Sequence, residues 1–464
     1  MTKGVLSSFL QRRGSFCVIK VAVIGSGISG LAAAHTLRGA AHVTLFESGS
    51  YFGGHTHTVD VTLPTPHGDI THGVDTGFLV FNERTYPGLI KLFSTLNVAT
   101  AKSEMSFSVQ SHNPHSGQRM EWSGTSLNAL FAQRSNLVNW RFWRMLIDIQ
   151  RFNSLCTGMA GRDTDIQMRQ TVGDFLKENR FSDEFCDGYF LPMAACIWSC
   201  PTAQMLQFPM ATMIRFCHNH GLLQITNRPQ WWTVQGGAKH YVEKIVSSLA
   251  DARLNTPVRS IERLGPDARD TLRKPVRIST DHTQEYFDAV IIAAHSDEAL
   301  ALLKAPTQLE RTLLGAISYH ANRAVLHTDS GVLPTRKAAW AAWNYERALG
   351  VKSDSTKGNS TAPAVCLHYL INRLQPLPWS QPVVVSLNPI RDIADQYVLG
   401  QFAYSHPVFD SAAIKAQRQI PWLQGQQNTY YCGAWMGYGF HEDGLKAGQQ
   451  AATQLLNHHG QAAP

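Results

Sequence analysis

Residues 21–30 read Val-Ala-Val-Ile-Gly-Ser-Gly-Ile-Ser-Gly, and this stretch decides the fold. Its first four residues are a continuous apolar run rich in β-branched side chains, which is typical of a parallel strand buried on both faces. Three glycines follow in the spacing G-x-G-x-x-G, and residues 31–37 have a helical pattern. A second apolar run at 42–46 ends in Glu47. This order of strand, glycine turn, helix, strand and acid predicts a βαβ dinucleotide-binding unit.

Each glycine has a separate role in such a turn. Gly25 permits the tight exit from the strand, Gly27 lets the backbone approach a diphosphate, and Gly30 lets the helix pack closely on the strand. The first N–H groups of the helix and its positive dipole end favour phosphate. Glu47 can accept both hydroxyls of an adenosine ribose. The predicted contacts of this end are therefore Gly25, Ser26, Gly27, Ile28, Ser29, Gly30, Glu47 and Ser48.

Three further features favour FAD over a nicotinamide dinucleotide. Side-chain-free Gly53 and Gly54 allow a second loop to press on the cofactor, with His55 and Thr56 directly after them. No second G-x-G-x-x-G follows a strand later in the chain. Residues 430–448 read as a strand, a glycine-rich turn and a helix, whose start could stabilise reduced flavin. The predicted contacts there are Gly433, Ala434, His441, Glu442, Asp443 and Gly444.

These motifs resemble the flavin-containing amine oxidoreductase superfamily, which includes amine oxidases, protoporphyrinogen oxidase and phytoene-type desaturases. Several stretches look most similar to the bacterial FAD-binding oxidoreductases encoded beside cyclopropane-fatty-acid-synthase-like methyltransferases: 53–59, 75–78, 197–199, 232–237, 343–345 and 439–444. The resemblance implies a Rossmann-type α/β FAD-binding domain with an inserted α+β substrate domain. It also implies that the backbone around Val258 borders the adenine and that Ala293 ends a strand near the cofactor.

The implied layout is discontinuous. The FAD-binding domain would comprise 18–100, 230–305 and 420–464, the substrate domain 101–229 and 306–419, and residues 1–17 a flexible lead-in.

The chain departs from the superfamily pattern at four places. Ala434 stands where many relatives have an acid, and His55 where many have arginine. Residues 319–325 match the stretch that carries a lysine near the flavin in amine oxidases, but they contain none. His441, next to Phe440 and Tyr438, stands where amine oxidases present an aromatic ring. These differences count against amine oxidation and make His441, then Tyr438, the candidates to face the flavin ring.

Bulk composition limits the other possibilities. A net charge of +7 in 464 residues, without a basic tract, does not indicate a nucleic-acid partner. The eight cysteines form no CxxC pair, which favours a reducing, cytoplasmic compartment, and no metal site is expected. Residues 137–152 are predicted to form an amphipathic helix whose arginines share one face with Asp148, while Trp143 and Ile147 belong to the apolar face. Such a helix either packs inward or contacts the inner membrane face.

Three functions remain open. The first is an FAD-dependent oxidoreductase that moves a hydride from a substrate C–H bond to flavin N5, dehydrogenating a lipophilic, acyl-lipid-like small molecule. The second is a peroxide-producing amine oxidase. The third is a non-catalytic FAD-bound partner of a lipid-modifying enzyme. Trp198, Trp231, Trp232, Trp340 and Trp343 are candidates for an apolar substrate tunnel, with core packing as the alternative.

Overall fold

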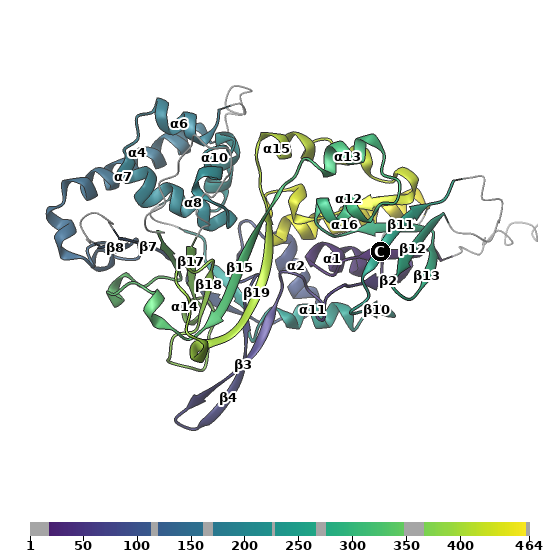
Figure 1. Cartoon of the computed structure of the whole chain (residues 1–464), viewed down its shortest axis with the longest axis horizontal. Coiled ribbons are helices and arrows are strands. Elements are labelled where there is room, and N and C mark those ends of the chain that lie inside the picture. The colour runs from purple at the N-terminus through teal and green to yellow at the C-terminus, as the bar shows by residue number, and fades with distance from the viewer. Residues whose placement is uncertain are drawn as a thin grey trace, which may run out of the picture.

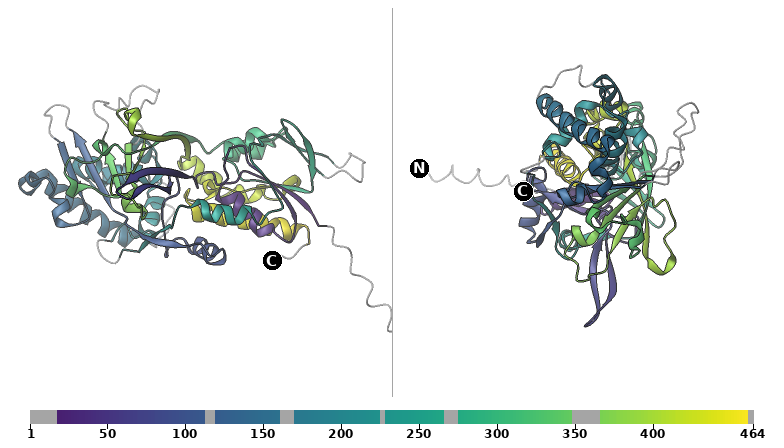
Figure 2. Two further views of the ribbon diagram at one scale, coloured as in Figure 1. Left: turned by 90° about the horizontal axis from the view of Figure 1, so that it is seen from below. Right: turned by 90° about the vertical axis from the view of Figure 1, so that its left-hand side faces the viewer.

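The computed structural model describes residues 18–112, 119–160, 170–224, 228–265, 275–347 and 366–460. The lead-in predicted at 1–17 lies outside these residues. Two lobes lie side by side along the long axis of the molecule (Figures 1 and 2). The first holds both ends of the described chain, and the second is built mainly from its middle.

The first lobe is organised around a five-stranded parallel sheet. The spatial order is β10-β2-β1-β14-β20, with β1 pairing in parallel with both β2 and β14. Strand bounds are β10 (Asp251–Arg253), β2 (His42–Phe46), β1 (Lys20–Ile24), β14 (Ala289–Ile292) and β20 (Thr429–Tyr431). The predicted Rossmann-type α/β fold with a second, mixed lobe is confirmed.

Alternate side chains of β1 enter different cores, as the two-residue period of a strand requires. Val21 and Val23 face one core, whose helices are α1 (Ile28–Leu37), α2 (Pro87–Thr95), α11 (Lys239–Val246) and α16 (His441–His458). Ala22 and Ile24 face the other core. Its elements are β11 (Val258–Arg263), β12 (Val276–Thr280), β13 (Gln284–Phe287), α12 (Ser296–Leu302), α13 (Gln308–Leu314) and α15 (Ser411–Gln417).

The second lobe contains a seven-stranded sheet in the order β19-β15-β18-β17-β16-β7-β8. Its strands are β19 (Val398–Pro407), β15 (Tyr319–His327), β18 (Val384–Leu387), β17 (Cys366–Leu370), β16 (Trp343–Glu346), β7 (Phe107–His112) and β8 (Arg119–Ser123). The main apolar core joins this sheet to α4 (Trp140–Met159), α6 (Val172–Glu178), α7 (Asp183–Phe185), α8 (Leu191–Trp198), α9 (Thr202–Met205) and α10 (Met210–Asn219). The long strands β15 and β19 run along the junction of the two lobes (Figure 1).

Two small sheets lie where the lobes meet, and the chain also crosses there through β15 and β19 (Figure 1). The two sheets are the hairpin of β3 (Thr58–Thr65) and β4 (Gly68–Asp75), and the sheet of β5 (Phe81–Asn82), β9 (Trp231–Val234) and β6 (Thr100–Ser103). Asp75 is buried at this crossing, where its carboxylate accepts hydrogen bonds from Thr58, the Ala238 backbone (2.9 Å) and Gln375 (2.8 Å). Burial raises the pKa of Asp75 to about 7, although these donors favour the ionised form.

Helix α4 buries a different face from the one predicted. Its buried side chains include Phe142, Met145, Phe152 and the supposedly surface-facing Asp148, whereas Trp143 and Ile147 are exposed. Asp148 is satisfied inside because its carboxylate accepts the backbone N–H (3.0 Å) and hydroxyl (2.5 Å) of Ser182. The sequence period cannot show this, because the partner that makes burial of the acid tolerable comes from a distant turn.

Candidate active site

The glycine turn after β1 has the geometry of a backbone cradle. Gly25 has φ +96°, and its N–H donates to Phe46 O at 2.8 Å. A Cβ on Gly30 would lie 1.9 Å from Gly25 O, so only glycine allows this contact between helix and turn. A Cβ on Gly27 would meet nothing within 4 Å. The space in front of Gly27 is therefore open to a ligand.

Glu47 lies at the end of β2, beside this turn. Its Oε2 accepts the backbone N–H (3.0 Å) and hydroxyl (2.5 Å) of Ser26, and its Oε1 accepts the N–H of Gly49 (2.8 Å). These bonds fix the carboxylate at the cavity wall. The exposed Ser48 hydroxyl makes a fourth, longer contact to Oε1 at 3.4 Å. A carboxylate has about four acceptor sites, so a ribose hydroxyl would bind by displacing this Ser48 contact.

A second glycine loop presses on the first. The Gly53 N–H donates to the Ser26 hydroxyl at 3.1 Å, and Gly53 has φ +125°. A Cβ on Gly54 would lie 3.1 Å from the Gly27 Cα. The two loops thus present bare backbone to the same space.

The far end of the chain reaches this point. Helix α16 packs against α1 so closely that a Cβ on Gly448 would lie 2.1 Å from Ser29 O, and one on Gly444 2.8 Å from Ile28. Trp435, in the short turn η8 (Ala434–Met436), donates its Nε1–H to Ala294 O at 3.1 Å. Its indole covers Gly433, where a Cβ would lie 2.1 Å from that nitrogen.

These segments enclose one cavity of about 1180 Å³. It exceeds the ~300–1,000 Å³ of typical small-molecule sites, so a large cofactor and a substrate fit together. The predicted site residues that line it are Gly25, Ser26, Gly27, Ile28, Ser29, Glu47, Ser48, Gly53, Gly54, His55, Val258, Ala293, Gly433, Ala434 and His441. Six others fall outside the lining: Gly30, Thr56, Tyr438, Glu442, Asp443 and Gly444.

The two acids of α16 hold the backbone in place. Glu442 is buried and accepts the N–H groups of Gly88 and Leu89, each at 2.9 Å, at the start of α2. Asp443 reaches back to the N–H groups of Tyr438 and Phe440, both at 3.0 Å. They shape the glycine-rich loop that presents His441.

His441 is held as a neutral ring. It stacks on Phe78 with centroids 3.7 Å apart, and its Nε2 lies 2.8 Å from the Thr56 hydroxyl and 3.2 Å from the Tyr241 hydroxyl. Burial lowers the pKa of His441 to about 3. At neutral pH the ring carries no charge. Thr56 does not line the cavity, but its hydrogen bond to His441 helps to hold this ring in place.

Five rings gather at the junction of the lobes, and of these only His55 was predicted from the sequence as a site residue. His55 lies 5.0 Å from the Tyr404 ring and 5.2 Å from the His406 ring, while His295 stacks on Tyr319 at 4.5 Å. All five line the cavity. They come from four separate segments, so no spacing links them. The repeated pairing of His and Tyr on β15 and β19 was the available signal.

The junction histidines are also uncharged. Burial lowers the pKa of His55 to about 4 and holds that of His406 far below its usual range. The Asn322 amide donates to Nδ1 of His406 at 2.9 Å, which places the proton of neutral His406 on Nε2. The buried Nε2 of His55 has no hydrogen-bond partner among the described residues. A bound ligand with a polar edge would supply one.

Beyond the junction the cavity wall is apolar and aromatic. It includes Trp231 and Trp343 of the predicted tunnel residues, but not Trp198, Trp232 or Trp340. Its other walls come from the seven-stranded sheet, from α8 and the turn just before it, from α10 and from the residue before α16: Phe107, Trp122, Tyr189, Met193, Ile197, Phe216, Tyr369, Leu387 and Phe440. The charged lining residues in this lobe are Glu104 and Arg228, both exposed.

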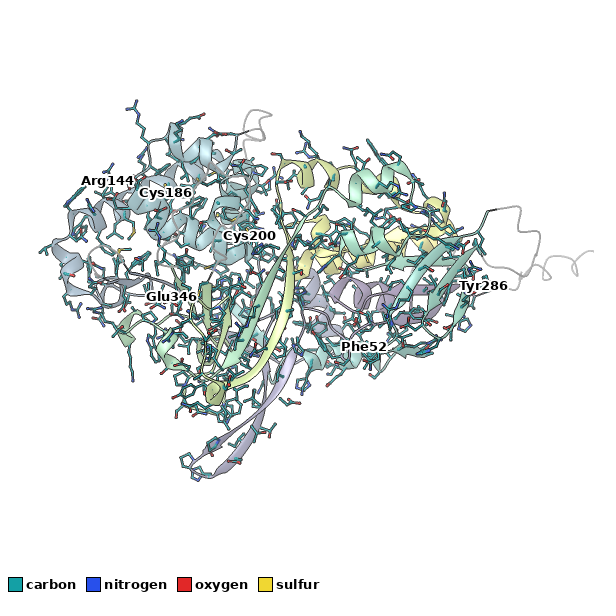
Figure 3. The ribbon with its side chains drawn as sticks, viewed as in Figure 1. Phe52, Arg144, Cys186, Cys200, Tyr286 and Glu346 are labelled. Atoms are coloured by element: carbon teal, nitrogen blue, oxygen red, sulfur yellow. The ribbon has the colours of Figure 1, made fainter. Side chains whose placement is uncertain are left out.

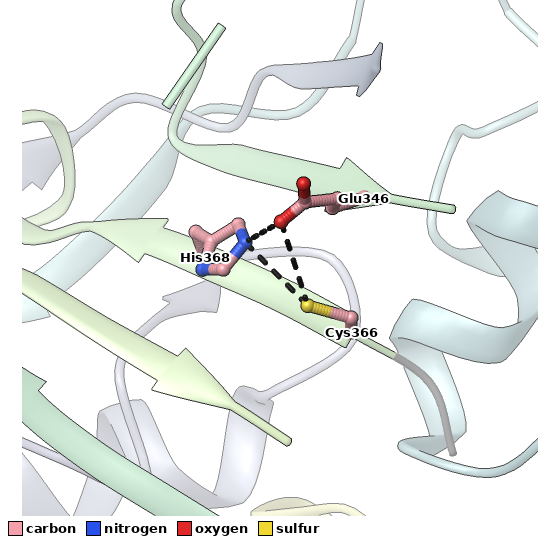
Figure 4. A group of neighbouring side chains, drawn as sticks. All are labelled: Glu346, Cys366 and His368. Carbon is pink, nitrogen blue, oxygen red and sulfur yellow. Dashed lines mark hydrogen bonds and ion pairs between the residues drawn. The ribbon is translucent and has the colours of Figure 1, made fainter. Parts of the chain in front are cut away.

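A separate polar cluster lies in the seven-stranded sheet, outside the cavity lining (Figure 4). His368 Nε2 lies 3.0 Å from Glu346 and 3.5 Å from Cys366, a set of atoms that could hold a metal ion. Hydrogen bonds explain it as well. The Asp329 N–H donates to Nδ1 of His327, so neutral His327 donates from Nε2 to Ser386 (2.7 Å), whose hydroxyl donates to His368 Nδ1 (2.6 Å). His368 Nε2 then donates to Glu346. With a proton on Nε2, this nitrogen has no lone pair left to bind a metal ion.

The fold and cavity define a dinucleotide-binding flavoprotein with a second, substrate-binding lobe. The profile of the family described as flavin containing amine oxidoreductase matches residues 28–377. The chain belongs to this family and is an FAD-dependent oxidoreductase. The bare backbone at Gly27 and Gly54 and the unpartnered His55 Nε2 fit this cofactor.

Solved structures of similar fold extend over nearly the whole chain. The CLA-producing fatty acid isomerase from P. acnes is 16% identical with a TM-score of 0.61, covering 94% of this chain and 98% of that one. Cyclohexylamine oxidase from Brevibacterium oxydans IH-35A is 15% identical with a TM-score of 0.63, covering 96% and 100%. A putative protoporphyrinogen oxidase from Exiguobacterium sp. 255-15 is 16% identical with a TM-score of 0.59, covering 95% and 98%. No curated protein sequence matches the chain.

Across the described ranges, every helix is too short or too polar to cross a bilayer.

Proposed function

We propose that the protein dehydrogenates a lipophilic, acyl-lipid-like small molecule, with hydride transfer from a substrate C–H bond to flavin N5. The observation that carries this proposal is the predominantly apolar, aromatic half of the cavity. Apolar walls bind alkyl chains by removing their surface from water. A protonated amine would need a partner there, and the two charged lining residues of this lobe stand at exposed positions. The likeness to a fatty acid isomerase agrees with the proposal, while the amine-oxidising neighbours share the same fold.

FAD supplies the hydride acceptor when bound. The chain's own residues orient substrate and exclude water. Neutral His441 and His55 can accept hydrogen bonds without placing a positive charge beside the reacting carbon. This suits a reaction in which the substrate carbon becomes electron-poor.

The division of labour between lobes is part of the proposal. The FAD-binding domain would comprise 18–100, 230–305 and 420–464, and the substrate domain 101–229 and 306–419. In support, the parallel sheet draws its strands from the first set and the seven-stranded sheet from the second. Helices α13 and α15 fall within the second set by sequence but pack in a core of the first lobe. A substrate of this kind resides in membranes, so peripheral contact with a lipid surface also belongs to the proposed function.

The decisive experiment is anaerobic bleaching of the flavin absorbance near ~450 nm, because reduction reports the hydride donor directly. Acyl lipids, isoprenoids and amines are presented as three panels. Bleaching by acyl lipids supports the proposal, and bleaching by amines alone replaces it with amine oxidation. Bleaching by no panel, with photoreduced flavin that reoxidises normally, would favour a non-catalytic FAD-bound partner.

Two neighbouring tryptophans give a matched pair of variants. Trp343 lines the cavity, whereas Trp340 lies in a separate core and donates its Nε1–H to Pro334 O at 2.7 Å. Trp343→Leu should change the chain-length preference of bleaching, and Trp340→Leu should leave it unchanged. If both variants kept the chain-length preference of the wild type, the aromatic half of the cavity would not be part of the substrate site.

A further inference from the structure

Half of the exposed large hydrophobic side chains in the described part of the chain lie within 21 residues. They form what we call the α4 patch: Leu127, Leu137, Val138, Trp140, Trp143 and Ile147. Val138 is 88% exposed, Leu127 77%, Ile147 64% and Trp140 63%. Isolated exposed apolar side chains need no explanation, but six of them gathered in one short segment indicate an interaction surface.

The α4 patch is built on a rigid base. On the opposite side of α4, Phe142 and Met145 are buried in the main core. Above them, Trp143 donates its Nε1–H to Leu137 O at 2.9 Å and packs on Phe131 with ring centroids 5.6 Å apart. Trp140, Trp143 and Ile147 recur at three- and four-residue spacing, so they share one face of the helix. The patch is thus a preformed surface.

The segment that carries the patch is cationic. Residues 124–147 contain Arg134, Arg141 and Arg144 and no acidic residue. All three arginines are exposed, and Figure 3 shows Arg144 at the outer edge of the second lobe. The nearest recorded acid is Glu184, 3.7 Å from Arg141. Tryptophan and aliphatic side chains bordered by arginine are the composition of interfacial helices that lie on anionic lipid.

The patch also adjoins the cavity. Gly124 and Thr125 line the cavity and are exposed, and Leu127 follows two residues later at the start of α3 (Leu127–Leu130). A surface resting on lipid through Leu127 would bring this end of the cavity close to the acyl chains.

We propose that the α4 patch docks the protein on an anionic lipid bilayer and that substrate enters the cavity at Gly124 and Thr125. This inference deepens the proposed function, on which its substrate rests. The bilayer is favoured over a protein partner because the patch combines exposed tryptophans, three exposed arginines of which Arg141 alone has an acidic neighbour recorded among the described residues, and a chain segment that leads directly to the cavity lining.

The test is co-sedimentation of the FAD-loaded protein with vesicles of phosphatidylcholine, with or without phosphatidylglycerol. The wild-type protein should bind the anionic vesicles more tightly, and added salt should weaken binding. The variant Val138→Ser/Trp140→Ser/Ile147→Ser should lose at least about tenfold in affinity, because three apolar side chains no longer leave water. Arg141→Gln/Arg144→Gln should reduce the preference for phosphatidylglycerol.

The matched control is Trp422→Ser, since Trp422 is 61% exposed in the first lobe. It should bind vesicles as the wild type does. Wild-type protein that binds neither vesicle, or a triple variant that binds as well as wild type, would overturn the inference. A dimer in light scattering that the triple variant converts to monomer, without vesicle binding, would assign the patch to a second copy instead.

A second readout separates this inference from the proposed function. With substrate dispersed in detergent, the triple variant should bleach its flavin as fast as wild type, and only vesicle-borne substrate should bleach more slowly. Vesicle binding without bleaching by any acyl lipid would leave the docking surface standing and reject the substrate class. A triple variant slowed equally on dispersed and vesicle-borne substrate would overturn delivery through the patch.

Discussion

Replacing Gly27 by valine separates cofactor binding from folding. Gly27 has φ −61° and ψ 174°, an extended conformation open to any residue, and its Cβ would meet no protein atom within 4 Å. The loss of a glycine N-cap and the smaller entropy of the unfolded chain act in opposite directions, so the apoprotein should change in stability by less than ~1 kcal/mol.

The effect on FAD should be much larger. The new side chain occupies the open space in which a diphosphate would approach the backbone of the turn. Loss of two charge-assisted hydrogen bonds, at ~1.5–3 kcal/mol each, weakens binding by roughly 3–6 kcal/mol. That corresponds to ~10²–10⁴-fold in Kd.

The assay is titration of FAD into apoprotein, beside urea unfolding of the same apoprotein. Gly158→Val is the binding control, because Gly158 lies in α4 and its Cβ also meets nothing within 4 Å. Gly30→Val is the folding control, because its Cβ would collide with Gly25 O and should destabilise the apoprotein itself. Gly27→Val with a Kd within about threefold of wild type would refute the location of the diphosphate, since even one lost bond exceeds that.

Three further outcomes follow from buried polar groups. Glu442→Gln should lower the free energy of unfolding by ~1–3 kcal/mol in urea, because one of its two N–H partners at the start of α2 loses its acceptor; an unchanged midpoint would contradict this role. Asp148→Ala should cost ~2 kcal/mol, whereas exposed Arg144→Ala should cost under ~0.5 kcal/mol; equal costs would contradict the burial of Asp148. Burial lowers the pKa of His327 to about 4, so the unfolded state gains its proton first and stability falls as pH drops from 6.5 to 4. Asp75, with its pKa raised to about 7, acts in the opposite sense, so the histidine effect is read as a shallower slope in His327→Gln than in wild type.

Sequence reasoning succeeded where a function depends on backbone and local order. The turn at Gly25 and Gly27 is encoded by neighbouring residues of the sequence, and the next parallel strand, at 42–46, is a short apolar run. It could not assign Glu442 and Asp443, because an acid in the first turn of a helix can face a ligand or reach a neighbouring backbone. In this fold Glu442 reaches a neighbouring backbone, because the N–H groups of Gly88 and Leu89 at the start of α2 donate to its carboxylate. The grouping of His55 with His295 and His406 was missed for the same reason, because these rings meet only after the strands pair.

The arrangement of charge along the cavity would let one site hold a charged cofactor together with the lipophilic substrate that we propose. The diphosphate needs donors, and the glycine loops supply backbone N–H groups, which carry no net charge toward the substrate. Between the two ends stand rings such as His55 and His441, which burial keeps neutral. Cationic residues at these positions would attract water and counterions into the apolar half and weaken its hold on an alkyl chain. Under the proposed function, neutral His55 would keep this part of the cavity free of charge, and His55→Arg should impair acyl-lipid bleaching more than FAD retention.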